Sequence, residues 1–209
     1  MKYSLAVDIG GTFTDIVLKS ADGSLAVDKT LTTPDDLIRG FFDGVSAVLR
    51  RAGIDASEVD GVVVHATTVV TNALIERKGE ATALLTTEGF RDVLLIRNEH
   101  RYEMYDPQIE FPEPLVPPEL TFGVSERTLS DGTVLKSVPR ADVEAIARKL
   151  KALDVRSVAI CFLNSFANPA NERAAAEILA EMLPGIFVTA SSDVAPQIRE
   201  FQRASTATA

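Results

Sequence analysis

The sequence is poor in cysteine and in basic charge, and it lacks long apolar runs. Cys161 is the only cysteine among 209 residues, which excludes an internal disulfide and fits a reducing, cytoplasmic compartment. Lysine and arginine number 21 against 30 aspartates and glutamates, and this net charge of −9 argues against nucleic acid or an anionic membrane as a partner. No apolar run approaches the roughly 20 residues of a membrane span, and no signal peptide is expected.

The first twenty residues contain the most informative pattern. An apolar run ends at Asp8, Gly10 and Gly11 follow, and Thr12 and Thr14 lead into a second apolar run. The pattern predicts two strands joined by a tight turn, with a carboxylate and two hydroxyls beside it. Such a turn suits a Mg²⁺-bound triphosphate, because bare N–H groups and hydroxyls donate to phosphate oxygens and a carboxylate holds the metal or its water.

A simpler interpretation stands beside this one. Two glycines between strands commonly form only a hairpin turn, and an aspartate near a strand end is commonly a turn cap. The whole string from Asp8 to Asp15 favours the phosphate site over the plain turn. Asp15 faces the opposite side of its strand from Thr14, so it could instead bond a neighbouring strand or turn. Neither a Walker A sequence nor a Gly-x-Gly-x-x-Gly after a strand occurs.

A second polar run lies where a predicted buried strand, 61–65, enters a helix. It contains His65, Thr67 and Thr68, and helix N-termini offer N–H groups and a positive potential that suit an anion or a developing oxyanion. Asn72 lies one helical turn further and could face the same pocket. Each residue also has a purely structural explanation, a core histidine for His65 and a helix N-cap for Thr68.

The string from Asp8 to Asp15 resembles the first phosphate motif of the actin/Hsp70/sugar-kinase superfamily. In this form it is most similar to the N-terminal region of the hydantoinase A/5-oxoprolinase family. Further similar stretches follow in the family's order: 65–79, 83–93, 105–106 with 114–117, and 125–127 with 131–132. Ala66 departs from the pattern, because the family usually has glycine there, although a small residue is kept.

The resemblance implies ATP and Mg²⁺ as cofactors. By the same resemblance, the catalytic residues would be Asp8, His65 and Thr68, the cofactor-binding residues Gly10, Gly11, Thr12 and Thr14, and the metal ligand Asp8. The implied activity is the hydrolysis of a cyclic amide, such as a hydantoin or a 5-oxoproline-like lactam, after phosphorylation of its carbonyl oxygen.

Other functions stay open. The same family includes carboxylases of small ketones, which the motifs do not separate from hydrolases of cyclic amides. A phosphotransferase similar to sugar or acid kinases and a non-catalytic nucleotide-binding module are further hypotheses. The expected partners are a cyclic amide, a C-terminal half of the fold and a second subunit.

The order of the predicted elements indicates an α/β fold. Three strands, 5–9, 12–20 and 25–30, form an antiparallel meander, a helix starts at Thr33, and the later strands alternate with helices. This is the order of an RNase H-like half of an actin-like ATPase fold, with a mixed sheet flanked by helices. Residues 1–97 are expected to form that core with the first phosphate motif, 98–138 a Pro-rich insertion, and 139–209 the continuation of the α/β domain, truncated before the second half.

The remaining chemistry-bearing residues are few. Arg97, His100 and Arg101 form a small basic cluster before the insertion, either a solvated surface or a contact to a substrate carboxylate or carbonyl. The insertion itself is either a surface excursion or a lid over a site. Cys161 lies in an apolar strand and is expected to be plain core. No zinc-ligand spacing and no Gly-x-Ser-x-Gly elbow occur.

Overall fold

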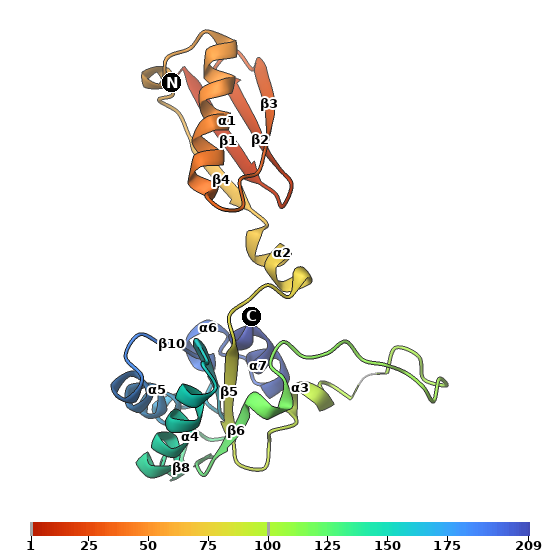
Figure 1. Cartoon of the computed structure of the whole chain (residues 1–209), viewed down its shortest axis with the longest axis vertical. Coiled ribbons are helices and arrows are strands. Elements are labelled where there is room, and N and C mark those ends of the chain that lie inside the picture. The colour runs from red at the N-terminus through yellow and green to blue at the C-terminus, as the bar shows by residue number, and fades with distance from the viewer. Residues whose placement is uncertain (1, 100) are drawn as a thin grey trace. The chain divides into compact units, whose positions relative to one another are not determined.

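Two compact units make up the computed structural model, which describes residues 2–99 and 101–209. The first unit is Met1–Lys78 and the second is Gly79–Ala209 (Figure 1). Each unit has a sheet and a hydrophobic core of its own. The boundary expected after residue 97 therefore falls inside the second unit, because residues 82–87 form a strand of the second sheet.

The first unit holds a four-stranded mixed sheet in the order β3-β2-β1-β4. Its elements are β1 (Tyr3–Ile9), β2 (Phe13–Ser20), β3 (Leu25–Leu31), α1 (Leu37–Ala52), the 3₁₀ turn η1 (Ala56–Glu58), β4 (Val63–Thr67) and α2 (Val69–Glu76). The first three strands pair antiparallel and β4 pairs parallel with β1, so the predicted meander is confirmed.

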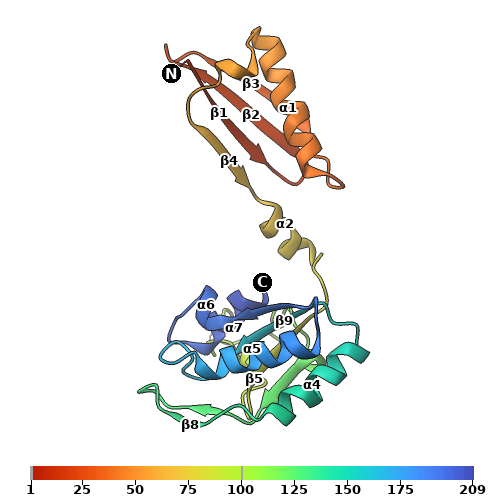
Figure 2. The same cartoon turned by 90° about the vertical axis from the view of Figure 1, so that its left-hand side faces the viewer.

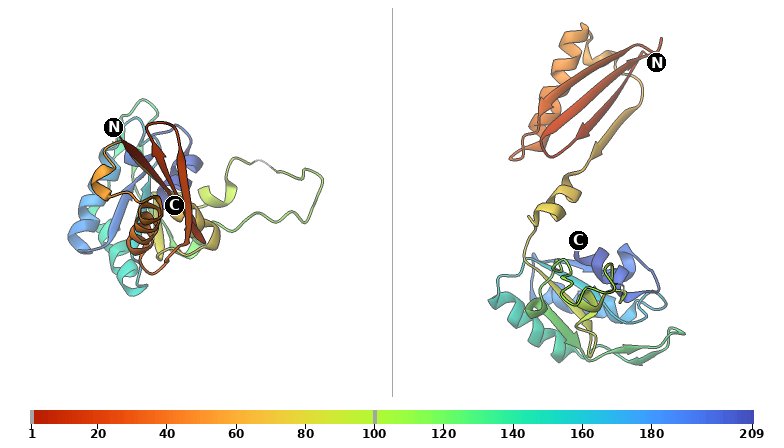
Figure 3. Two further views of the ribbon diagram at one scale, coloured as in Figure 1. Left: turned by 90° about the horizontal axis from the view of Figure 1, so that it is seen from above. Right: turned by 90° about the vertical axis from the view of Figure 1, so that its right-hand side faces the viewer.

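Helix α1 covers one face of this sheet (Figure 3). Alternate apolar side chains of β1 and β2 form the core with α1, namely Leu5, Val7, Ile9, Ile16, Leu18, Val48 and Leu49. The helix start predicted at Thr33 is wrong, because α1 begins at Leu37 and its N-cap is Asp36, whose carboxylate accepts the N–H of Arg39 at 3.1 Å. The helix ends at Gly53 in the left-handed conformation, as its sequence predicts.

Strand β4 is exposed, which corrects the prediction of a buried strand at 61–65. Val62, Val63 and Val64 are each more than half exposed. The physical reason is that β4 pairs with β1 alone and α1 packs mainly over β2 and β3. A run of valines predicts a strand that is buried on both faces. In the first unit, β4 is an edge strand of the sheet and its valines are exposed.

The second unit holds a fully parallel sheet in the order β10-β9-β5-β6. Its elements are β5 (Thr82–Thr87), α3 (Val93–Ile96), the 3₁₀ turn η2 (Pro118–Leu120), β6 (Thr121–Val124), β7 (Arg127–Thr128), β8 (Val134–Lys136), α4 (Arg140–Ala152), β9 (Ser157–Cys161), α5 (Ala170–Met182), β10 (Phe187–Ala190), α6 (Ser191–Val194) and α7 (Glu200–Thr208). Strands β7 and β8 form a separate hairpin.

Helices cover both faces of the parallel sheet (Figure 2). Side chains of β5 alternate, so that Ala83 and Leu85 pack with α4 and α5 while Leu84 packs with α3 and α7. The same alternation divides β9, where Cys161 belongs to the α7 side. Cys161 is buried as predicted, and burial raises the pKa of its thiol to about 11.

The Pro-rich segment is irregular over most of its length, as its composition predicts. Residues 101–117 contain no helix or strand, whereas β6, inside the expected insertion of 98–138, is part of the parallel sheet. The rings of Tyr102 and Phe111 meet edge to face at 5.8 Å, and the guanidinium of Arg97 lies over Phe111. His100 of the basic cluster lies outside the described residues. No helix in residues 2–99 and 101–209 is long and apolar enough to cross a membrane.

A buried ionic network joins α5, α6 and α7. The fully buried carboxylate of Glu172 accepts hydrogen bonds from the N–H of Phe162 (2.9 Å), the hydroxyl of Ser191 (2.6 Å) and the N–H of Ser192 (2.9 Å). The fully buried guanidinium of Arg203 donates to the carbonyl of Phe162 at 2.7 Å and reaches the Ser191 hydroxyl at 3.4 Å. Sequence patterning gives no sign of this pair.

We expect Glu172→Gln to lower the free energy of unfolding by about 2 kcal/mol or more. The amide puts an N–H where the carboxylate accepts one and removes a charge that satisfies three donors. Urea unfolding followed by circular dichroism measures the change. Glu177→Gln, an exposed position on the same helix, is the matched control and should stay within about 0.5 kcal/mol of wild type. Equal stabilities of the two variants would contradict the structural role of Glu172.

Candidate phosphate-binding site

The turn between β1 and β2 presents unused backbone donors. The N–H of Gly10 donates to the carbonyl of Phe13 at 2.9 Å and closes the turn. Within the described part of the chain, the N–H groups of Gly11 and Thr12 have no hydrogen-bond partner, and both residues are exposed. Successive unpaired N–H groups in a turn form an anion-binding concavity. Gly11 and Thr12 therefore supply the predicted bare donors, whereas the donor of Gly10 is occupied.

Thr32, which follows β3, holds this turn in place. Its hydroxyl donates to the carbonyl of Gly10 at 2.9 Å, and its N–H donates to the carbonyl of Thr12 at 2.9 Å. The hydroxyls of Thr14 and Thr32 lie 3.2 Å apart. Local sequence patterns do not indicate Thr32, because its role depends on contacts between residues about twenty positions apart. A polar residue directly after the third strand of the meander is the signal that could have indicated it.

Thr14 lies in the core and not at the turn surface. Its side chain is 1% exposed on the α1 side of the sheet, and its hydroxyl is engaged with Thr32. Thr12 precedes β2 and is exposed, so only one of the two predicted hydroxyls is accessible at the turn. In this structure Thr14 supports the turn from below, and Thr12 is the hydroxyl that faces outward.

Space for a side chain is tight at two glycines of the turn. A Cβ at Gly10 would lie 3.0 Å from the carbonyl oxygen of Phe13, which is fixed backbone. A Cβ at Gly11 would lie 2.7 Å from the Nδ2 atom of Asn72, on the helix that follows β4. Neither glycine has a positive φ, so close approach explains both. The cradle that a Cβ would fill is a feature that a phosphate site needs.

Asp8 lies on the face of the sheet that α1 does not cover. Its neighbours Val7 and Ile9 are buried against α1, so strand alternation points Asp8 the other way, where it is exposed. Asp15 is its direct partner across β2, and the Asp15 carboxylate pairs with the Lys29 ammonium at 3.0 Å. Asp15 thus bonds the neighbouring strand, the alternative left open by the sequence. Within residues 2–99 and 101–209 no hydrogen bond or ion pair engages the Asp8 carboxylate, so it is available to a cation.

The start of α2 meets the same turn. Thr68 is the N-cap residue, and its N–H donates to the carbonyl of Ile9 at 3.1 Å, which ties α2 to the end of β1. The amide of Asn72 donates to the Thr68 hydroxyl at 3.3 Å. The proximity of Asn72 to Gly11 brings Thr68 and Asn72 to the turn, and a shared pocket of the two residues stays a prediction. Helix α2 ends at Glu76, and Arg77 caps it in the left-handed conformation.

His65 is not brought together with Asp8. In the β1–β4 ladder His65 pairs with Val7 and Ala66 pairs with Asp8, so His65 is on the α1 face. Its ring meets that of Phe41 edge to face, with centroids 5.8 Å apart. The side chain beside Asp8 on the open face is the small Ala66. The side chains of His65 and Asp8 therefore lie on opposite faces of the sheet and do not meet at one site in this structure.

The residues at the turn fit a Mg²⁺-nucleotide. Magnesium is commonly held by one or two carboxylates together with phosphate oxygens and water, so a single exposed Asp8 suffices as the protein ligand. No group of three or more histidine, cysteine or carboxylate side chains that could hold a metal by itself occurs in the described residues. Unpaired donors, space at two glycines and one carboxylate are the features that the sequence predicted and the structure brings together.

Comparisons with known proteins point in the same direction. A family described as hydantoinase/oxoprolinase N-terminal region matches residues 4–183. The caprolactamase subunit alpha of Pseudomonas jessenii is 34% identical over 210 residues, which cover 98% of this chain and 30% of that protein. The chain thus spans less than a third of the length of this relative.

Two solved structures are similar over nearly the whole chain. The ATP-dependent caprolactamase from Pseudomonas jessenii superposes with a TM-score of 0.85 at 34% identity, covering 99% of this chain and 30% of that one. A nucleotide-free acetone carboxylase superposes with a TM-score of 0.88 at 30% identity, covering 99% of this chain and 31% of that one. The expected fold class is confirmed by these likenesses together with the mixed sheet and its helices.

We expect Thr32→Val to lower the free energy of unfolding by about 1–2 kcal/mol. The change keeps the shape of the side chain but removes the hydroxyl that bonds the Gly10 carbonyl and faces Thr14. The matched control is Thr30→Val, because Thr30 lies on β3 and no side-chain hydrogen bond of its hydroxyl is found in the described residues. Urea unfolding measures both variants. A loss in Thr30→Val as large as that in Thr32→Val would refute the bracing role.

Proposed function

Because the chain belongs to the hydantoinase/oxoprolinase family and corresponds to its N-terminal region, we propose that it is the nucleotide-binding part of an ATP- and Mg²⁺-dependent hydrolase of cyclic amides. The observation that carries the proposal is the β1–β2 turn, where the N–H groups of Gly11 and Thr12 are unpaired within the described residues and the carboxylate of Asp8, near the end of β1, is exposed. Relatives whose names describe ATP-dependent lactam hydrolysis support the choice of reaction.

The residues of the turn have distinct proposed roles. Gly11 and Thr12 donate to phosphate oxygens, and Asp8 holds Mg²⁺ directly or through water. Thr68 and Asn72, at the N-terminal end of α2, face a further oxygen of the anion. Gly10 closes the turn and Thr14 supports it, so both act on the shape of the site. His65 lies on the other face and is left without a catalytic role.

The chemistry explains why an amide hydrolase would use a nucleotide. Resonance deactivates an amide carbonyl, and transfer of the γ-phosphoryl group to its oxygen releases ADP and gives a phosphorylated imidate. One water adds to the imidate carbon and the ring nitrogen leaves as the amine, which gives an acyl phosphate. A second water hydrolyses the acyl phosphate to the carboxylate and phosphate. Phosphoryl transfer depends chiefly on positioning and neutralisation of charge, which a rigid turn with amide donors supplies. Transfer of this kind needs no nucleophilic side chain, and the buried Cys161, with its raised pKa, is unsuited to be one.

A second candidate is a subunit of a small-ketone carboxylase. The similarity to acetone carboxylase supports this second candidate. The geometry of the turn does not separate the two candidates, because the same turn would serve both reactions. In either case we propose that the remainder of the enzyme, and a second subunit of the kind that the relatives' names imply, complete the site. A ring-opened amino acid with ADP and phosphate would identify the hydrolase, and a carboxylated ketone the carboxylase.

The proposal is tested by calorimetric titration of the chain with Mg-ATP. We expect saturable binding that Asp8→Asn weakens at least tenfold, because the neutral amide no longer supports the cation. Asp43→Asn, an exposed position on α1 without a bonding partner within the described residues, is the matched control and should bind as wild type does. Binding that is insensitive to Asp8→Asn, or no binding by folded protein, would overturn the assignment of the turn.

A further inference from the structure

The second unit has a topological switch point of its own. From β5 the chain passes through α3, on the α7 side of the sheet, to β6 on one edge. From β9 it passes through α5, on the opposite face, to β10 on the other edge. Strands β5 and β9 are parallel neighbours whose connections leave in opposite directions. In open α/β sheets, ligands bind in the crevice beyond the carboxyl ends of such a strand pair.

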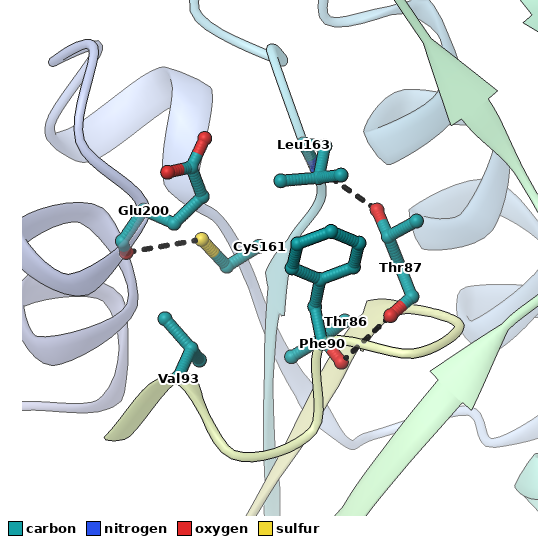
Figure 4. A pocket seen from close by; sticks show the side chains of 7 residues that line it. All are labelled: Thr86, Thr87, Phe90, Val93, Cys161, Leu163 and Glu200. Atoms are coloured by element: carbon teal, nitrogen blue, oxygen red, sulfur yellow. Dashed lines mark hydrogen bonds between the residues drawn. The ribbon is translucent and has the colours of Figure 1, made fainter. Parts of the chain in front are cut away.

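A small hollow marks this point (Figure 4). Thr86 and Thr87 at the end of β5, and Cys161 at the end of β9, line it together with Phe90 and Glu200. The Thr87 hydroxyl accepts the N–H of Leu163 at 2.9 Å, and the Cys161 thiol lies 3.7 Å from the carbonyl of Glu200. The polar groups of the floor are thus largely engaged with one another, and the hollow forms a rigid base.

A larger crevice adjoins this base. It has a volume of about 560 Å³ and shares Phe90, Val93 and Glu200 with the hollow. Two guanidinium groups and three carboxylates line it, beside an apolar wall that includes Phe90 and Phe201. The charged residues are Arg97, Arg199, Asp92, Glu99 and Glu200. This size suits a small organic molecule.

The rim of the crevice is held in an unusual conformation. Arg97 and Glu99 both have positive φ, at 60° and 56°, which is costly for residues other than glycine. Arg97 is fixed by a hydrogen bond to the Pro112 carbonyl and by its contact with Phe111. Asn98, between them, accepts a hydrogen bond from Gln202 of α7 at 3.2 Å. Arg199 differs, because its guanidinium has no partner in the described part of the chain.

The mixed charge of the lining selects the ligand. Three carboxylates against two guanidiniums disfavour a simple anion, and the guanidiniums disfavour a simple cation. We propose that the crevice binds a small amino acid whose carboxylate and ammonium groups are separated by an apolar carbon chain. Arg199 pairs with the carboxylate, Asp92 takes the ammonium group, and the chain lies along Phe90 and Phe201.

The choice of an amino acid rests on the proposed function, since opening a cyclic amide leaves a carboxylate and an amine on one carbon chain. The presence of the crevice does not depend on the proposed function. Its residues all belong to the second unit, whereas the phosphate turn belongs to the first. Binding of an amino acid without nucleotide is therefore a separate measurement from binding of Mg-ATP.

The test is a titration of the whole chain with 6-aminohexanoate and 4-aminobutanoate, followed by NMR or calorimetry without nucleotide. We expect saturable binding of at least one of them and much weaker binding of hexanoate and hexylamine. Arg199→Gln and Asp92→Asn should each weaken binding about tenfold or more. Arg148→Gln, exposed on α4 at the other face of the sheet, should leave it unchanged.

Three outcomes would overturn the proposal. One is the absence of saturable binding of either amino acid by folded wild-type protein. The second is equal binding of hexanoate, which would reduce the crevice to an anion site. The third is binding unaffected by both Arg199→Gln and Asp92→Asn in variants whose thermal unfolding matches wild type. Amino-acid binding without any Mg-ATP binding would uphold the crevice and reject the nucleotide function.

Discussion

The packing of α1 against one face of the first sheet is the interaction on which the candidate phosphate site depends. Burial of Leu5, Val7 and Ile9 against this helix fixes the orientation of β1, and strand alternation then directs Asp8 to the open face. The same alternation buries Thr14 beneath the turn and turns His65 away from Asp8. A shift of β1 by one residue would bury the Asp8 carboxylate and expose the apolar side chains of the core. The register of β1 that stabilises the fold therefore also fixes the position of the carboxylate.

Much of this arrangement could be predicted from the sequence. The meander, the glycine turn and the parallel entry of β4 follow from local patterns, and Asp8, Gly11 and Thr12 lie where those patterns place them. The resemblance of one short string to a phosphate motif is borne out at the level of family and fold. The string encodes a turn with small residues and a carboxylate. These features are local and do not depend on contacts with distant parts of the chain.

The rest depends on contacts between residues far apart in sequence. Thr32 braces the turn only because β3 returns beside it, and the register of β4 against β1 decides that Ala66, not His65, lies beside Asp8. The buried Glu172 and Arg203 look like surface charges in a helical pattern, and only the fold, which brings Ser191 at the start of α6 between them, makes them partners. The order of the parallel strands, and hence the switch point between β5 and β9, is likewise a property of topology.

The most direct test of the central claim is the amide NMR spectrum of the chain during addition of Mg-ATP. The account predicts that the N–H resonances of Gly11 and Thr12 shift most, because these are the unpaired donors of the turn. Resonances of Gly53 and Gly132, which lie in other turns, should remain in place. Saturable shifts confined to other residues, with Gly11 and Thr12 unmoved, would contradict the claim that this turn binds phosphate.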